Sequence, residues 1–360
     1  MENPTSFTHP IAHFIHRHFL LLLLVAYGAA AVLPAPGLWL RSVSFGTTGL
    51  AGATVHWTLP LVMLAVLLFN AGLGMQMRRL SSLVRQPVVL AAGLAANLLL
   101  PLALLLGLSV ALHLWHSHAE AQSLLVGLAL VAAMPVAGSS AAWVQRADGD
   151  LPLSLGLVLG STLLSPWTTP LALHLAGLLT DGVYADALHD LADAGTGMFL
   201  LAGVVLPSLA GALAHAVAGE ARLARIRPQL KLGSALVLLV LCYANAAVAL
   251  PHVLADPDWD FVAMLLTAVA ALCVLNFTAG WVVSRLLGTD PAQRAALVYS
   301  LGMNNNGTGL VLAAATLGAY PRILLPLIAY NLVQHLVAGG VGITMKPTAP
   351  AGLSARGVSA

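Results

Sequence analysis

Charged residues are scarce in this sequence. Only 8% of its 360 residues are Asp, Glu, Lys or Arg, against about a quarter in soluble domains. Hydrophobic residues make up 59% of the chain, and its mean hydropathy is +0.91. Such a composition excludes a soluble enzyme, a disordered tail and a nucleic-acid-binding protein.

Cysteines and catalytic motifs are also scarce. The two cysteines, Cys242 and Cys273, both lie in apolar stretches and outside any CxxC pattern, so we expect buried free thiols. The chain contains no HExxH, no GxSxG and no P-loop. Metalloprotease, hydrolase and ATP-driven functions therefore have no support, and we expect neither an enzyme nor an organic cofactor.

Long uncharged stretches fill the sequence. Ten windows of 23 to 36 residues contain no Asp, Glu, Lys or Arg, whereas a helix needs about 20 apolar residues to cross a bilayer. No segment alternates with period two, which excludes a membrane β-barrel and leaves helices. The sequence thus predicts an all-α polytopic membrane protein with spans near residues 16–34, 57–76, 87–112, 121–144, 152–179, 196–218, 230–251, 260–286, 293–318 and 322–344.

The distribution of Lys and Arg predicts the orientation. If the spans alternate, 13 of the 15 basic residues fall on the side of the N-terminus, and only Arg41 and Arg322 fall on the other. Seven aspartates between residues 181 and 260 also fall on the side opposite the N-terminus. Basic loops stay in the cytoplasm. We therefore expect a multi-pass protein of a bacterial-type plasma membrane with both termini in the cytoplasm.

Ten spans divide near residue 190 into two groups of five, and an odd number per group requires the second group to insert inverted. We expect a first repeat over 1–190, a second over 191–346 and a flexible cytoplasmic tail over 347–360. The fourth span of each half contains a helix-breaking segment, MPVAGSS (134–140) and GMNNNGTG (302–309). Two breaks at corresponding places predict a binding site near the membrane midplane.

The second break carries three consecutive amides, Asn304, Asn305 and Asn306. On a helix they would spread over about 200° of the surface, whereas an unwound stretch lets them line a cavity. The alternative is that they only satisfy the broken backbone. We predict a substrate site formed by uncharged side chains from both breaks and the eighth span: Ser139, Asn305, Asn306, Thr308 and Asn276.

Other intramembrane polar residues have two interpretations each. Ser154, Ser161 and Ser165 share one face of the fifth span and could face the first break, or could simply permit close packing. His335 could relay a proton, although an interhelical hydrogen bond is the simpler role. No carboxylate falls inside a predicted span.

Four stretches resemble the bile acid:sodium symporter family: VMLAVLLFNAGLGMQM, MPVAGSSAAWVQRADGDLPLSLGLVLGSTLLSPWTTPL, YSLGMNNNGTGLVLA and LPLIAYNLVQHLVAG. The resemblance implies a panel of spans 1, 2, 6 and 7 and a core of spans 3–5 and 8–10, in which the fourth and ninth helices cross where they are broken. It also implies sodium-driven secondary transport of an organic anion, such as a bile acid or small carboxylate, by alternating access.

The resemblance places sodium ligands on six residues, Leu301 and Met303 through backbone carbonyls and the others through side chains: Ser140, Ser154, Ser300, Leu301, Met303 and Asn304. Several positions depart from the family pattern. Ser300 stands where the family has Glu, and Asn304 where it has Gln. Further ligand positions hold Ala141, Val158 and Ala96, the last with Asn97 beside it.

The missing carboxylate weakens the case for sodium, because it would neutralise the ion in a low-dielectric site. Hydroxyl, amide and carbonyl oxygens still suit a hard cation. We expect at most one sodium ion, or binding balanced by an anionic substrate. Three alternatives remain: proton-coupled or passive transport, a related metalloid or auxin-type carrier, and a non-transporting sensor or scaffold. The chain lacks the Cys that arsenite carriers have in the fourth span, which speaks against the metalloid carrier.

Overall fold

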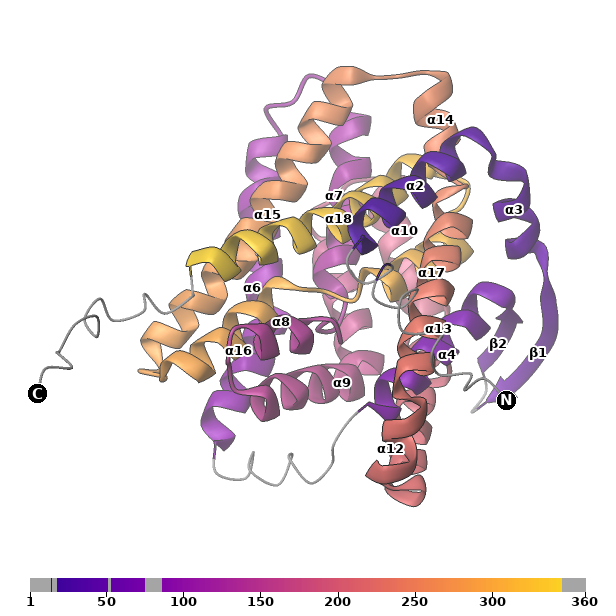
Figure 1. Ribbon diagram of the computed structural model, residues 1–360. Coiled ribbons are helices and arrows are strands. Elements are labelled where there is room, and N and C mark those ends of the chain that lie inside the picture. Colours follow the sequence, from indigo (N-terminus) through magenta and orange to yellow (C-terminus); the bar gives the residue numbers. More distant parts are fainter. Residues whose placement is uncertain (1–13, 15–17, 51–52, 75–85, 345–360) are drawn as a thin grey trace, which may run out of the picture.

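The structure, a computed structural model, describes residues 14, 18–50, 53–74 and 86–344. The tail predicted at 347–360 lies outside these residues. The described chain is mostly helical (Figure 1). Its first half contains α2 (Phe19–Val32), α3 (Pro34–Ser42), α4 (Leu59–Leu73), α6 (Pro87–Leu112), α7 (His118–Ala133), α8 (Ser140–Arg146), α9 (Leu151–Gly177) and α10 (Val183–Leu191).

The second half begins with two π-helical turns, η2 (Ala192–Thr196) and η3 (Leu201–Val205), on either side of α11 (Gly197–Leu200). The remaining helices are α12 (Leu206–Ala218), α13 (Glu220–Ala246), α14 (Leu250–Ala255), α15 (Trp259–Leu286), α16 (Pro291–Gly302), α17 (Asn306–Thr316) and α18 (Pro321–Thr344).

Six helical segments in the described part are long and apolar enough to cross a membrane, and α2 with α3, bent by 91°, would make a seventh. The six are Pro87–Leu112, Leu151–Gly177, Gly197–Ala218, Glu220–Ala246, Trp259–Leu286 and Pro321–Thr344. This confirms a polytopic helical membrane protein. The three other predicted spans hold shorter or interrupted helices, so the count of ten stays a prediction.

A β-hairpin is a local departure from the predicted all-α fold. Strand β1 (Ser44–Leu50) pairs antiparallel with β2 (Ala53–Thr58), and the Trp57 indole donates to the Thr48 hydroxyl at 2.8 Å. Val, Thr and Trp favour strands, and Gly46 adopts a positive φ of 110°. The sequence does not predict these strands, because the segment is uncharged and too short to show a clear period.

The helix that carries the predicted seventh span starts earlier than the predicted span. Helix α13 begins at Glu220 rather than near residue 230, and Arg227 donates to the Glu220 carboxylate at 2.6 Å within it. Charged residues stop a hydropathy window but do not stop a helix that projects beyond the lipid.

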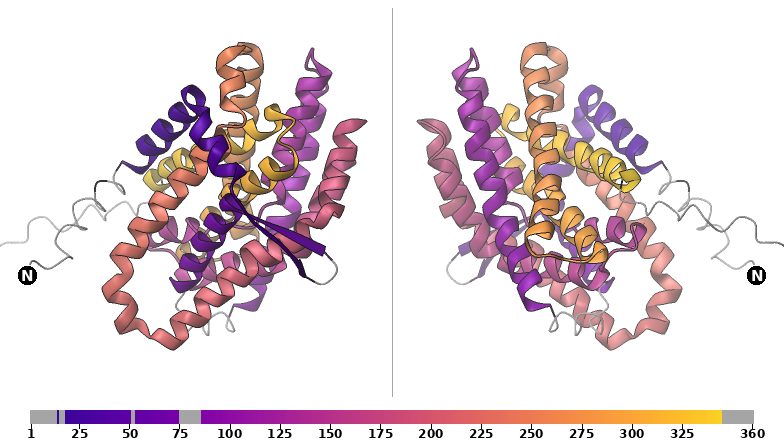
Figure 2. Two further views of the ribbon diagram at one scale, coloured as in Figure 1. Left: turned by 90° about the vertical axis from the view of Figure 1, so that its right-hand side faces the viewer. Right: turned by 90° about the vertical axis from the view of Figure 1, so that its left-hand side faces the viewer.

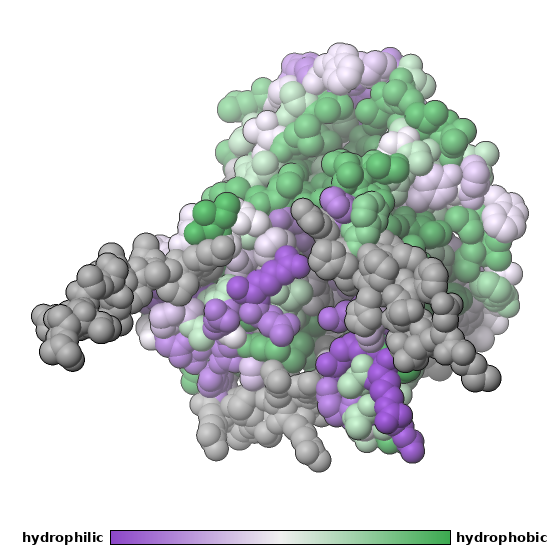
Figure 3. Space-filling view, viewed as in Figure 1, coloured by the Kyte–Doolittle hydropathy of each residue, from purple (hydrophilic) through white to green (hydrophobic). Residues whose placement is uncertain are grey.

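The helices pack in two groups that position the interrupted segments. In the smaller group α13 packs against α2, α4 and α12, and α4 packs against α12. The larger group consists of α6, α7, α9, α15, α16 and α18 (Figures 1 and 2). Hydrophobic side chains cover much of the upper face in Figure 3, and hydrophilic ones gather over α8 and the α12–α13 turn. An apolar surface of this kind fits lipid.

Candidate functional site

Both predicted breaks interrupt their helices. Helix α7 ends at Ala133, the backbone is extended at Met134, and α8 starts at Ser140. Helix α16 ends at Gly302, Met303 is extended with φ −121° and ψ 116°, and α17 starts at Asn306. The helix-breaking residues therefore act as the sequence indicates.

The two breaks lie directly against each other. They form an isolated antiparallel bridge between Val136 and Asn304. The amide of Ala137 donates to the Met303 carbonyl at 2.9 Å, and the amide of Asn305 donates to the Pro135 carbonyl at 2.9 Å. Each segment thus supplies hydrogen bonds that the other lost by leaving the helix.

Asn304 and Asn306 are held by Gln334 of α18. The Gln334 Oε1 atom accepts from the Asn304 backbone amide at 3.1 Å and from Asn306 Nδ2 at 3.2 Å. Asn304 Nδ2 donates to the Val131 carbonyl at 2.8 Å. These bonds use the amide N–H groups, while the Oδ1 atoms of Asn304 and Asn306 are buried and have no partner.

Asn305 and Thr308 lie at the start of α17. Asn305 Oδ1 accepts from the Thr308 backbone amide at 3.3 Å, so this side chain caps the helix. Asn305 is half-buried, whereas the Thr308 hydroxyl is buried without a partner. The alternative interpretation of the three asparagines is that they only satisfy the broken backbone. Asn305 fits that interpretation in part, since it accepts a hydrogen bond from the backbone of α17.

Two side chains of α9 face the first break. Ser161 Oγ accepts from the Val136 amide at 3.0 Å, and the Thr169 hydroxyl donates to the Ala133 carbonyl at 2.8 Å. Ser165 instead donates to the Thr162 carbonyl within its own helix. The polar stripe is thus partly a support for the interrupted backbone and partly local.

The residues assigned to sodium are brought together only in part. The hydroxyls of Ser154 and Ser300 lie 3.2 Å apart, and both side chains are buried. Ser140 is fully buried on α8, which packs against α9 and α16, and its Oγ atom has no partner. Leu301 is buried near the end of α16, and the Met303 carbonyl already accepts from Ala137.

The remaining predicted substrate residues are less central. Ser139 is exposed where α8 begins. Asn276 of α15 donates to the Tyr330 hydroxyl at 3.0 Å, which donates in turn to the Gly302 carbonyl at 3.4 Å. Asn276 therefore reaches the second break through Tyr330. Neither Tyr330 nor Gln334 is among the site residues predicted from the sequence. For Gln334 a signal existed, because an amide inside an apolar span is unusual.

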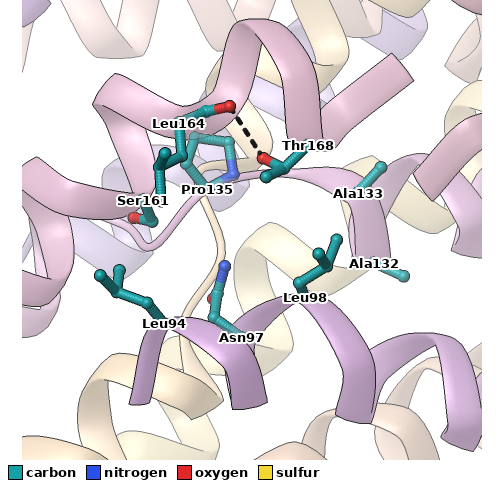
Figure 4. A pocket seen from close by; sticks show the side chains of 9 residues that line it. All are labelled: Leu94, Asn97, Leu98, Ala132, Ala133, Pro135, Ser161, Leu164 and Thr168. Carbon is teal, nitrogen blue, oxygen red and sulfur yellow. Dashed lines mark hydrogen bonds between the residues drawn. The ribbon is translucent and has the colours of Figure 1, made fainter. Parts of the chain in front are cut away.

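A small cavity of about 20 Å³ adjoins the first break, between α6 and α9 (Figure 4). Asn97, Pro135, Ser161 and Thr168 contribute to its wall, and the Asn97 Oδ1 atom is buried without a partner. This volume accommodates a water-sized guest.

The site is polar but uncharged. Among the described residues, the fully buried set contains no Asp, Glu, Lys or Arg. No cluster of three His, Cys, Asp or Glu suited to a metal occurs in that part of the chain either. What the crossing offers is neutral oxygen, the donor type of hard cations, on Ser140, Asn304, Asn306 and Thr308.

Comparison with known proteins identifies the family of this chain. Residues 61–256, more than half of the chain, match the Sodium Bile acid symporter family. The "Uncharacterized protein YbaS" of Bacillus subtilis (strain 168) is 26% identical over 218 residues, 61% of this chain and 67% of that protein.

The "Uncharacterized sodium-dependent transporter YocS" of the same organism is 25% identical over 281 residues, 77% of this chain and 81% of its own length. The residues that match the family model include the first interrupted helix. The chain belongs to the sodium bile acid symporter family.

Proposed function

We propose that the protein is a secondary active transporter that carries a small organic anion, coupled to sodium, through the crossing of the two interrupted helices. The observation that carries the proposal is the antiparallel pairing of the breaks beside buried oxygens without partners. Broken backbone inside lipid is tolerated where it lines a site or is buried in protein. The name of YocS, a sodium-dependent transporter, supports the coupling ion.

The proposed architecture has ten spans in two inverted repeats, over 1–190 and 191–346, with both termini in the cytoplasm of a bacterial-type cell. Helices α7–α8 and α16–α17 would be the fourth and ninth spans. The two packing groups would be the panel and the core, and alternating access would move one against the other. The mirrored positions of the breaks support this arrangement.

The proposed sodium site draws on Ser140, Ser154, Ser300 and Asn304. Ser300 offers a hydroxyl where a carboxylate would balance the ion, so a bound sodium keeps most of its charge. We therefore propose a single sodium ion, whose charge is balanced when the anionic substrate binds. The unpartnered oxygens of Ser140 and Asn304 support this assignment because a cation would satisfy them.

Sodium binding is tested by the melting temperature of the purified protein in sodium and in choline salt. At about 100 times its Kd, sodium would add about 2.7 kcal/mol of stability. Ser140→Ala breaks no hydrogen bond, so the melting temperature in choline should stay unchanged while the sodium-dependent rise shrinks.

Tracer uptake of cholate into sealed proteoliposomes tests transport itself. Uptake that is equal in sodium and choline at saturating concentrations would remove sodium from the mechanism. Cholate binding without flux would instead indicate a sensor or scaffold.

A further inference from the structure

Arg41, near the end of α3, makes contacts that the proposed crossing does not use. One guanidinium nitrogen donates to Asn245 Oδ1 of α13 at 2.6 Å, and the other donates to the Ala314 carbonyl of α17 at 2.5 Å. Both partners are neutral oxygens. Within the described residues no carboxylate lies within 4.0 Å of this half-buried cation.

Arg322, in contrast to Arg41, is paired with carboxylates. It is the other basic residue on the side of Arg41 in the expected topology. Its guanidinium lies 3.5 Å from the Glu120 carboxylate and 3.3 Å from that of Asp258. Removing a cation from water without a counter-charge is unfavourable, so Arg41 is left able to attract an anion.

Asn245 supplies the second observation. It is fully buried, and its Nδ2 atom has no hydrogen-bond partner. Since its Oδ1 atom already contacts Arg41, the free N–H groups lie beside the guanidinium. The groups of this site that lack a partner of opposite charge or an acceptor, the Arg41 guanidinium and the Asn245 N–H groups, are all hydrogen-bond donors. A cluster of donors that carries a positive charge binds an anionic oxygen best.

A capping role for Arg41 accounts for only part of this. The Ala314 carbonyl is among the last four of α17, and a cation at a helix C-terminus is favourable. That role explains the contact with Ala314. It leaves the buried donor of Asn245 unexplained, because a capped helix end requires no further N–H group.

We infer that Arg41 and Asn245 form a binding site for the acidic group of an organic anion, a carboxylate or a sulfonate. This deepens the proposed function and rests on it. The site joins α3 and α13 to α17, and α17 begins at the crossing. Ala314 follows Asn306 by eight residues, about 12 Å along the helix. An anion held at Arg41 could extend its body along α17 toward the asparagines.

Binding of cholate, taurocholate and the uncharged methyl ester of cholate to the purified protein tests this site. We expect the wild type to prefer the two anions to the ester. Arg41→Gln should weaken anion binding about tenfold and abolish the preference, while Arg41→Lys should keep most of it. Arg322→Gln is the matched control and should leave the preference intact, because that charge is already paired.

Asn245→Asp is a second variant that tests the site even if the Arg41 variants do not fold. The change is nearly isosteric and puts a carboxylate where we expect the ligand's acid. This variant should melt at or above the wild-type temperature and bind cholate less tightly. Wild-type binding in Asn245→Asp or Arg41→Gln, or no binding of either anion to the wild type, would overturn the inference.

The same samples separate this inference from the proposed function. Arg41-dependent binding without cholate uptake in sealed vesicles would refute transport and retain the site. Uptake by the wild type with an unchanged KM in Arg41→Gln would refute the site and retain transport.

Discussion

The three consecutive asparagines have two roles: they satisfy backbone groups at the break, and they leave side-chain oxygens free for a ligand. Asn305 caps α17, Asn304 and Asn306 use their N–H groups on Val131, Gln334 and the local backbone, and two Oδ1 atoms stay free. At the residue scale the amide is thus suited to this place because it carries both donors and acceptors. A hydroxyl offers one donor and one acceptor on a single atom, so it cannot bind a backbone group and present a separate oxygen as the amide does, and an aliphatic side chain offers neither.

Substitution of Asn305 separates capping from substrate contact. Asn305→Ser keeps an N-cap oxygen, whereas Asn305→Ala removes it at a cost of about 1 kcal/mol. We expect cholate uptake to be lost in both variants and the melting temperature to fall only in Asn305→Ala. Expression should stay intact, and normal uptake in Asn305→Ser would show that the amide acts as a cap alone.

At the scale of elements, backbone contact between α4 and α12 holds the smaller helix group together. A Cβ atom at Gly72 would lie 2.1 Å from the Ser208 carbonyl oxygen, and one at Gly211 would lie 2.0 Å from that of Phe69. Small residues allow helices to approach this closely in lipid. Neither position can relax cheaply, since the opposing atoms belong to the backbone.

Alanine at either glycine should therefore destabilise the protein. We expect Gly72→Ala and Gly211→Ala each to lower the melting temperature, by an amount equivalent to about 1–3 kcal/mol. Gly28→Ala is the control, because nothing lies within 4 Å of its added Cβ atom. A control that melts as early as the other two would contradict the packing argument.

Some elements could be predicted from the sequence and others could not. The breaks at 134–140 and 302–309 were predictable because Pro, Gly and consecutive Asn disfavour a helix locally. The hairpin at 44–58 was missed, since its strands depend on pairing with each other. The role of Gln334 was also missed, because nothing in the neighbouring residues of α18 specifies a partner 28 to 30 positions away.

At the scale of the whole molecule, charge asymmetry predicts the orientation in the membrane. Arg225 and Asp186 are both exposed and lie on opposite sides in the expected topology. We expect an impermeant maleimide added to intact cells to label Asp186→Cys and to spare Arg225→Cys.

The native cysteines provide a clean background for this labelling, because Cys242 and Cys273 are both buried. Permeabilised cells should expose position 225 to the reagent. Labelling of both positions in intact cells would contradict the orientation.

Composition determined that this chain is a membrane protein, because so few charged and so many apolar residues suit lipid rather than water. The long uncharged stretches without a two-residue period then left helices as the spanning elements. Local sequence also determined where two helices are interrupted. Only the tertiary structure decided that the interruptions pair with each other, that Ser154 meets Ser300, and that Arg41 lies against Asn245. These contacts join residues 146 to 204 positions apart, and packing rather than local preference brings such residues together.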